Sequence, residues 1–202
     1  MKIAMFGGSF DPIHNGHVSL AHAFVDTLCL EKVLIIPTHY PPHKQKKTTV
    51  TPQQRLDMCR LAFEGEELFE VSDIEIKREG KSYTYMTLEE LSIIYSDDEL
   101  YLITGADMFM TIDQWKEPEI IFRHAVICGV PRDDDDISAL KAQAEKLSLL
   151  GARTELLDPN IMTVSSTEIR QKISDGQKIT GLVPEKVERY IYENGLYADT
   201  KI

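Results

Sequence analysis

Short apolar runs rich in β-branched residues alternate along this chain with longer segments of helical periodicity, and this alternation limits the possible folds. The runs predict strands at Lys2–Phe6, Lys32–Pro37, Glu99–Thr104, Ala125–Val130 and Thr154–Leu157, and a weaker strand at Glu70–Glu75. Helical periodicity predicts helices from near Val18 to Leu28 and over Pro52–Phe63, Thr84–Ile94, Ile137–Leu149, Thr167–Ser174 and Pro184–Glu193, the last closed by Asn194-Gly195. Strands buried on both faces and joined by helical crossovers form a parallel sheet between helices. The sequence therefore predicts a doubly wound parallel α/β fold.

The size of the chain favours one domain. Its 202 residues, 43% of them apolar, can bury one sizeable core, and we expect a single domain over 1–202 with a helical C-terminal part at about 163–197. The apolar run at the N-terminus is short, and no later run approaches the ~18 apolar residues of a membrane span, which predicts a cytoplasmic protein without a membrane partner. Cys29, Cys59 and Cys128 form no CxxC pair and lie in apolar stretches, so we expect buried free thiols.

The charge distribution limits the ligands. A net charge of −11 argues against a nucleic-acid partner, since binding of the phosphate backbone needs a basic face. Any phosphate site must be local, and HYPPHKQKK at 39–47 is one local basic segment. The most acidic segment, Asp133–Asp136, is predicted to form a solvated loop, because its like charges repel. Its adjacent carboxylates lack the spacing of metal ligands.

The first predicted strand runs into IAMFGGSFDPIHNGH at residues 3–17. Gly7 and Gly8 can adopt backbone angles closed to other residues and leave room for a ligand at main-chain N–H groups. Gly16-His17 leads into a predicted helix beginning near Val18, and a helix N-terminus suits phosphate. His14 and His17 can then face the same anion. A tight turn is the alternative for the glycines, whereas a metal site is disfavoured because no third ligand accompanies the histidines.

A second motif, SSTEIR at 165–170, precedes a predicted helix. A plain N-cap would need one hydroxyl, whereas this segment offers three, and Arg170 lies one turn into the helix, where it can reach an anion. A surface ion pair is the alternative role of Arg170.

The two motifs together resemble those of the HxGH nucleotidylyltransferase superfamily, with His14-Asn15-Gly16-His17 as its HxGH element and SSTEIR as its SSTxIR element. With SYT at 82–84, GAD at 105–107 and Trp115, the chain is similar over nearly its whole length to the bacterial nicotinate mononucleotide adenylyltransferase family. The resemblance implies a Rossmann-like nucleotidylyltransferase fold. It also implies transfer of AMP from ATP to nicotinate mononucleotide, giving deamido-NAD and pyrophosphate in NAD biosynthesis, with Mg²⁺ as the cofactor and no metal-ligating residues assigned.

The resemblance also implies site residues. Catalytic roles fall on His14, His17 and Arg170, with His17 at the α-phosphate. The implied ATP-binding residues are Gly7, Gly8, Ser9, Phe10, His14, Gly16, His17, Lys44, Gly105, Asp107, Ser166, Thr167 and Arg170. Those implied for nicotinate mononucleotide are Ser9, Tyr83, Thr84, Trp115 and Lys116, with stacking on Trp115 and a carboxylate held by main-chain N–H groups near Thr84 and Lys116. Lys116 replaces an aromatic residue that often follows this tryptophan, which affects the packing around the ring.

Bland alternatives remain for single residues: Asp107 as a helix N-cap and Trp115 as a partly buried packing residue. Two other functions stay open for the chain. One is another HxGH enzyme such as phosphopantetheine adenylyltransferase, and the other is a nucleotide-sensing module that binds ATP without turnover. The sequence leaves room for a homo-oligomer.

Overall fold

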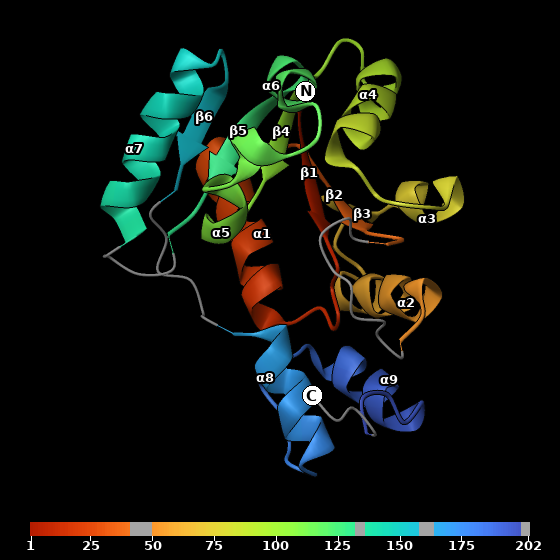
Figure 1. Cartoon of the computed structure of the whole chain (residues 1–202). Helices are drawn as coiled ribbons and strands as arrows, with labels where there is room; N and C mark the ends of the chain where they lie inside the picture. Colours follow the sequence, from red (N-terminus) through yellow and green to blue (C-terminus); the bar gives the residue numbers. More distant parts are fainter. Residues whose placement is uncertain (41–49, 132–135, 158–163, 199–202) are drawn as a thin grey trace.

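The computed structural model describes residues 1–40, 50–131, 136–157 and 164–198 (Figure 1). Its strands are β1 (Lys2–Gly8), β2 (Lys32–Pro37), β3 (Phe69–Val71), β4 (Glu99–Ile103), β5 (Ala125–Gly129) and β6 (Arg153–Leu156). They pair in parallel in the order β3-β2-β1-β4-β5-β6. The chain moves outward from β1 on one side and then outward on the other, as in doubly wound folds. The predicted fold class is confirmed.

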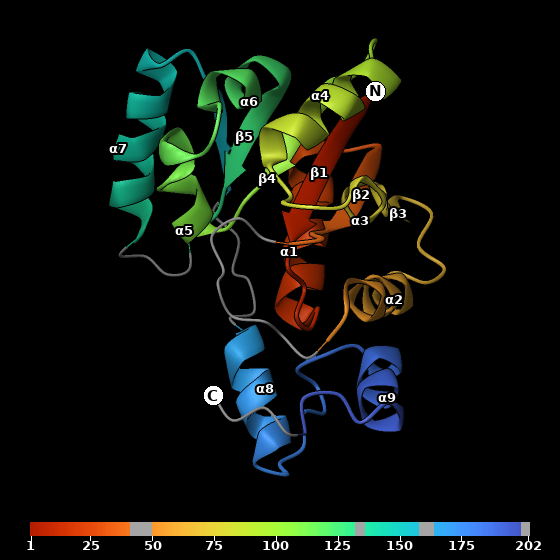
Figure 2. The same cartoon turned by 45° about the vertical axis from the view of Figure 1, so that its right-hand side comes forward.

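Helices cover both faces of this sheet (Figures 1 and 2). The helices are α1 (Asn15–Leu28), α2 (Pro52–Ala62), α3 (Ile74–Arg78), α4 (Thr84–Ile94), α5 (Ala106–Phe109), α6 (Pro118–His124), α7 (Asp136–Leu149), α8 (Ser166–Ser174) and α9 (Glu185–Glu193), with a 3-10 turn, η1 (Ile112–Gln114). Alternate residues of β1 point to opposite faces: Ala4 and Phe6 pack with α1, α2, α8 and α9, whereas Ile3 and Met5 pack with α4 to α7. The sheet is therefore buried on both sides, as its apolar strands predict.

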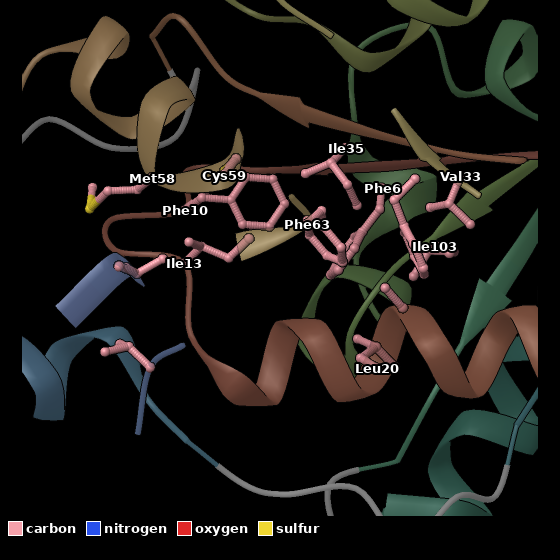
Figure 3. Packing of buried hydrophobic residues seen from close by; sticks show 14 of the residues in the cluster. Phe6, Phe10, Ile13, Leu20, Val33, Ile35, Met58, Cys59, Phe63 and Ile103 are labelled. Atoms are coloured by element: carbon pink, nitrogen blue, oxygen red, sulfur yellow. The ribbon is translucent and has the colours of Figure 1, made fainter. Parts of the chain in front are cut away.

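The apolar cluster that contains Ala4 and Phe6 extends to the loop that follows β1. Figure 3 shows Phe10 and Ile13 of that loop near Met58 and Cys59 of α2, and all four are buried. Ile169 and Ile173 of α8 belong to the same cluster. Figures 1 and 2 show α8 and α9 beyond the carboxyl ends of the strands. The loop is thus enclosed by elements far apart in the sequence.

Three sequence expectations are wrong in detail. The strand predicted at Glu70–Glu75 ends as β3 at Val71, and Glu75 lies in α3, where its buried carboxylate accepts a hydrogen bond from the Thr87 hydroxyl at 2.7 Å. The first helix begins at Asn15 rather than near Val18, because His14 caps it. Cys29 is exposed as the left-handed C-cap of α1, whereas Cys59 and Cys128 are buried free thiols as predicted.

The two charged segments fall largely outside the described residues. Of the basic segment 39–47, residues 41–47 with Lys44 lie outside them. Residues 133–135 of the acidic segment also lie outside them, whereas Asp136 begins α7. Among the described residues, no group of three or more His, Cys, Asp or Glu could hold a metal ion. Within the same residues, no helix is long and apolar enough to cross a bilayer.

Candidate active site

A cavity of about 400 Å³ opens at the carboxyl ends of β1 and β4. The pairing of β1 with β4 stops at Met5 and Leu102, whereas its pairing with β2 continues to Gly8 and Pro37. The strands therefore diverge where the strand order reverses, which is where doubly wound sheets bind ligands.

The two glycines after the apolar run of β1 provide space rather than unusual backbone angles. Gly7 and Gly8 still belong to the strand, and the positive φ in this loop is that of Phe10, at 45°. A Cβ atom on Gly8 would lie 3.0 Å from the Phe10 ring, and one on Gly7 would lie 3.1 Å from Met5 Cε. The two glycines therefore do not use the backbone angles that are closed to other residues. The missing side chain of Gly8 leaves room for the Phe10 ring, and that of Gly7 leaves room for Met5.

His14 and His17 form a reciprocal cap at the start of α1. The main-chain N–H of His17 donates to His14 Nδ1, and that of His14 donates to His17 Nδ1, both at 3.3 Å. Their rings stack with centroids 3.6 Å apart. Because each Nδ1 accepts a hydrogen bond, the proton of each neutral ring is on Nε2, which makes Nε2–H the donor.

The two imidazoles differ in their surroundings. His17 lines the cavity, whereas His14 lies behind it and is 5% exposed. Burial lowers the pKa of His14 to about 4. At neutral pH, His14 is therefore an uncharged hydrogen-bonding group.

The N-terminus of α8 is hydrogen-bonded to the loop between β1 and α1. Ser165 Oγ accepts from the Thr167 N–H at 3.2 Å and caps the helix. Ser166 Oγ donates to the Pro12 carbonyl at 3.1 Å, and Arg170 donates from Nη1 to the Asp11 carbonyl at 2.6 Å and from Nη2 to Thr167 Oγ1 at 3.1 Å. The motifs SFDPIHNGH and SSTEIR are thus in direct contact, although more than 140 residues separate them.

An aromatic wall forms the other side of the cavity. Tyr83 and Thr84, at the start of α4, line it together with Trp115 and Lys116. Lys116 Nζ lies 4.6 Å from the centroid of the Tyr83 ring, within cation–π distance. Trp115 is half-buried, and its indole N–H donates to Thr111 Oγ1 at 3.4 Å.

Comparisons with known proteins agree with this arrangement. A model of the cytidylyltransferase-like family matches residues 5–172. The chain belongs to this family. Curated relatives of the family carry the name "probable nicotinate-nucleotide adenylyltransferase". One from Clostridium tetani is 39% identical over 97% of this chain and 98% of its own length, and one from Desulfitobacterium hafniense strain Y51 is 39% identical over 97% and 95%. These matches confirm the resemblance to nicotinate mononucleotide adenylyltransferases.

Solved structures give the same fold. Plasmodium falciparum nicotinic acid mononucleotide adenylyltransferase complexed with NaAD superposes with a TM-score of 0.78 over 98% of both chains at 17% identity. The predicted nucleotidylyltransferase fold is confirmed.

The fold brings most of the site residues predicted from the sequence to one cavity. Those that line it are Gly7, Gly8, Ser9, Phe10, His17, Tyr83, Thr84, Gly105, Trp115, Lys116, Ser166 and Arg170. His14, Gly16, Asp107 and Thr167 are not among the lining residues, and Lys44 lies outside the described residues. Asp107 is exposed in the first turn of α5, whose N-cap is Gly105, so the N-cap alternative for Asp107 is wrong.

The cavity is also lined by residues that the sequence did not predict. Asp11, Thr38, Glu75 and Ser82 also line the cavity. Burial raises the pKa of Glu75, opposed by hydrogen bonds from Thr87 and Ser82. Asp11 and Ser82 lie within the motifs GGSFDPIHNGH and SYT, which assign them no role. Thr38 and Glu75 lie in no motif, because contacts between distant segments place them.

Two residues behind the cavity were missed as well. Arg55 is a cation on the apolar face of α2, beside Leu56 and Cys59. A charged residue on the apolar face of a predicted helix is visible in the sequence and could have indicated a buried polar contact. The Tyr197 hydroxyl donates to Asp11 Oδ1 at 2.7 Å, but Tyr197 follows the last helix and nothing in the pattern predicts its contact.

Proposed function

We propose that this chain transfers AMP from ATP to nicotinate mononucleotide, giving deamido-NAD and pyrophosphate in NAD biosynthesis. One observation carries the proposal: His17, Ser166 and Arg170, from two distant motifs, line the same cavity as Trp115. The names of relatives that match 97% of the chain support the same substrate pair. The solved neighbours, complexed with NaAD in one case and with APC in another, also support it.

The reaction depends on the alignment of the two substrates and does not need a general base. A nucleotide 5′-phosphate has a second pKa near ~6, so it is largely dianionic and nucleophilic at neutral pH. One of its oxygens attacks the α-phosphorus of ATP, the bond from that phosphorus to the bridging oxygen breaks, and pyrophosphate leaves. Donors aimed at the reacting phosphate stabilise the charge that develops there. We assign this role to His17 through Nε2–H, with His14 as its uncharged stacking partner.

The triphosphate is assigned to the loop after β1 and to the start of α8. Gly7, Gly8, Ser9 and Phe10 would approach it from the loop, and Ser166, Thr167 and Arg170 from α8. Gly16 lies in the first turn of α1, whose main-chain N–H groups suit phosphate, and Lys44 is proposed as a further cation. Gly105 and Asp107, after β4, are proposed for the adenosine side, where a carboxylate suits ribose hydroxyls.

The pyridine ring is assigned to the aromatic wall. Trp115 would stack on the ring, and the main-chain N–H groups of Thr84 and Lys116 would bind its carboxylate, beside Tyr83 and Ser9. The ammonium of Lys116 already lies over the Tyr83 ring, so the main chain rather than this side chain is the proposed carboxylate donor.

Nucleotidyltransfer generally uses a divalent metal, for which Mg²⁺ is proposed here. The described residues form no group of three or more acidic, His or Cys ligands. They fit an ion that arrives with the nucleotide, because Mg²⁺ usually keeps several waters and binds substrate phosphates with few protein ligands.

The domain organisation and the location of the reaction are also proposed. Burial of α8 and α9 residues in the same cluster as the β1 loop supports a single domain with a helical part at about 163–197. The reaction is expected in the cytoplasm, where ATP is available, without nucleic acid as a partner.

The experiment compares pyrophosphate release from ATP with nicotinate mononucleotide, nicotinamide mononucleotide and phosphopantetheine. Two N–H donors suit a carboxylate, whereas a carboxamide that turns its NH₂ toward one of them leaves a buried group unpaired. Hydrogen bonds to charged groups contribute roughly 1.5–3 kcal/mol each, so kcat/KM should favour the acid about 10- to 10⁴-fold over the amide.

Matched variants test the assignment of the ring site. Lys116→Ala should leave the preference for the acid largely intact, whereas Trp115→Ala should impair both pyridine substrates. Equal use of acid and amide would contradict the carboxylate site. Preferential use of phosphopantetheine would favour the other HxGH activity, and nucleotide binding without pyrophosphate release would favour a sensing module.

A further inference from the structure

Arg55 of α2 joins the ends of two neighbouring strands. Its guanidinium donates from Nη1 to the Ser9 carbonyl at 2.6 Å, and from Nη2 to the carbonyls of Thr38 at 2.5 Å and His39 at 3.1 Å. Ser9 follows β1, whereas Thr38 and His39 follow β2. The residue is 3% exposed. One buried side chain therefore fixes the loop after β1 relative to the segment after β2.

The segment after β2 is in turn bonded to the aromatic wall. The His39 N–H donates to Ser82 Oγ at 2.9 Å, and Ser82 directly precedes Tyr83 and Thr84. Ser82 also hydrogen-bonds the buried carboxylate of Glu75. A continuous set of partly buried polar contacts thus runs from Ser9, on the phosphate side of the cavity, through the buried Arg55 to the start of α4, on the pyridine side.

The contacts of Arg55 depend on its shape as well as its charge. Its hydrogen bonds go to main-chain carbonyls, and the carboxylates of Asp11 and Glu75 act on the guanidinium as nearby charges. The planar guanidinium presents two nitrogens in a fixed fork toward acceptors on different segments. A lysine has only one nitrogen and could not reproduce that geometry.

We propose that Arg55 is a positioning residue for adenylyl transfer, which sets the distance between the two halves of the cavity. The inference rests on the proposed function, because it requires two substrates bound at opposite ends of this network. Each half would still bind its own substrate without Arg55. Their mutual alignment would be lost, and a misplacement of about 1 Å can cost roughly 10²-fold in rate.

The test uses Arg55→Met and Arg55→Lys, with Met58→Ala as the matched control. Met58 is fully buried on the same helix and belongs to the cluster of Figure 3, but it has no part in the polar network. Both Arg55 variants should lower kcat by roughly 10²-fold per folded enzyme, with each KM within about threefold of wild type. Met58→Ala should lower the free energy of unfolding while it keeps the wild-type kcat per folded enzyme.

A binding measurement separates alignment from affinity. Trp115 is the only tryptophan and lines the cavity, so its fluorescence reports binding of nicotinate mononucleotide without turnover. The dissociation constant for Arg55→Met should stay within about threefold of wild type.

Three results would overturn the inference: a kcat of Arg55→Met within threefold of wild type, a kcat restored by Arg55→Lys, or an equal loss of kcat in Met58→Ala. A wild-type protein that releases no pyrophosphate from ATP and nicotinate mononucleotide would instead refute the proposed function, and the inference with it. An active wild type with an equally active Arg55→Met would refute the inference alone.

Discussion

At the scale of single residues, the exposure of the two stacked imidazoles decides what each can do. His17 lines the cavity, so His17→Ala should remove one preorganised donor to the transferring phosphate. Loss of such a donor typically costs ~2.7–4 kcal/mol, or about two to three decades in kcat. Steady-state pyrophosphate release measures the effect, and His22→Ala, which removes an imidazole paired with Glu66, is the control. Near-normal turnover of His17→Ala would contradict the role of His17.

His14 should make the stability of the protein depend on pH. Burial lowers its pKa from 6.5 to about 4, so between these values the unfolded state binds a proton that the folded state does not. Stability from this group is therefore lost as the pH falls through that window, by about 2 kcal/mol between pH 7 and pH 5 at ~1.36 kcal/mol per pKa unit.

His14→Asn provides the comparison, since asparagine caps helices without titrating. Urea unfolding at both pH values should show that the wild type loses about 2 kcal/mol more than the variant. An equal loss in the two proteins would mean that His14 is not buried as a neutral group.

At the scale of elements, α5 packs so closely on β5 that Gly129 of this strand has no room for a side chain. A Cβ atom on Gly129 of β5 would approach the Phe109 ring to 2.6 Å and Leu156 to 3.0 Å. Gly129→Ala should therefore lower the free energy of urea unfolding by about 1–3 kcal/mol. Gly105→Ala, with open space around its Cβ position, should change it by less than about 1 kcal/mol, because alanine only replaces a better N-cap residue of α5. Equal effects of the two substitutions would contradict this packing of α5.

The long elements could be predicted from the sequence because their apolar periodicity is strong. The strands around β1 and the helices α2 and α7 lie within a residue or two of the predicted bounds. Short elements such as α3 and α5 carry too few residues for a period, and tertiary contacts decide them. The helix of Glu75, for example, depends on a partner in α4.

The site could be predicted only where motifs mark it. The motifs HNGH and SSTEIR point to His17, Ser166 and Arg170, which do line one cavity. Nothing in the sequence points to the contact of Tyr197 with Asp11. Contacts of this kind connect segments whose distance in sequence hides their proximity.

At the scale of the whole molecule, the end of the chain stabilises its beginning. The Tyr197 hydroxyl is buried and donates to the carboxylate of Asp11, and burial together with that charge raises its pKa. Tyr197→Phe should lower the free energy of urea unfolding by roughly 1–3 kcal/mol, because it removes a hydrogen bond to the half-buried carboxylate of Asp11.

Tyr192→Phe is the control for Tyr197→Phe. Tyr192 is largely exposed on α9, and its substitution should change the free energy of unfolding by less than about 0.5 kcal/mol. Indistinguishable stabilities of the two variants would mean that the contact between Tyr197 and Asp11 contributes nothing.

The central place of β1 in the sheet affects how the protein is made. The ribosome synthesises this strand first, yet one of its neighbours, β4, begins about 90 residues later. At roughly 5–20 residues per second, the nascent chain carries β1 with one edge unpaired for several seconds. An apolar strand with an open edge invites association with other chains. The segment GGSFDPIHNGH therefore emerges early, but it acquires its partners in α8 only after about 150 further residues have been synthesised.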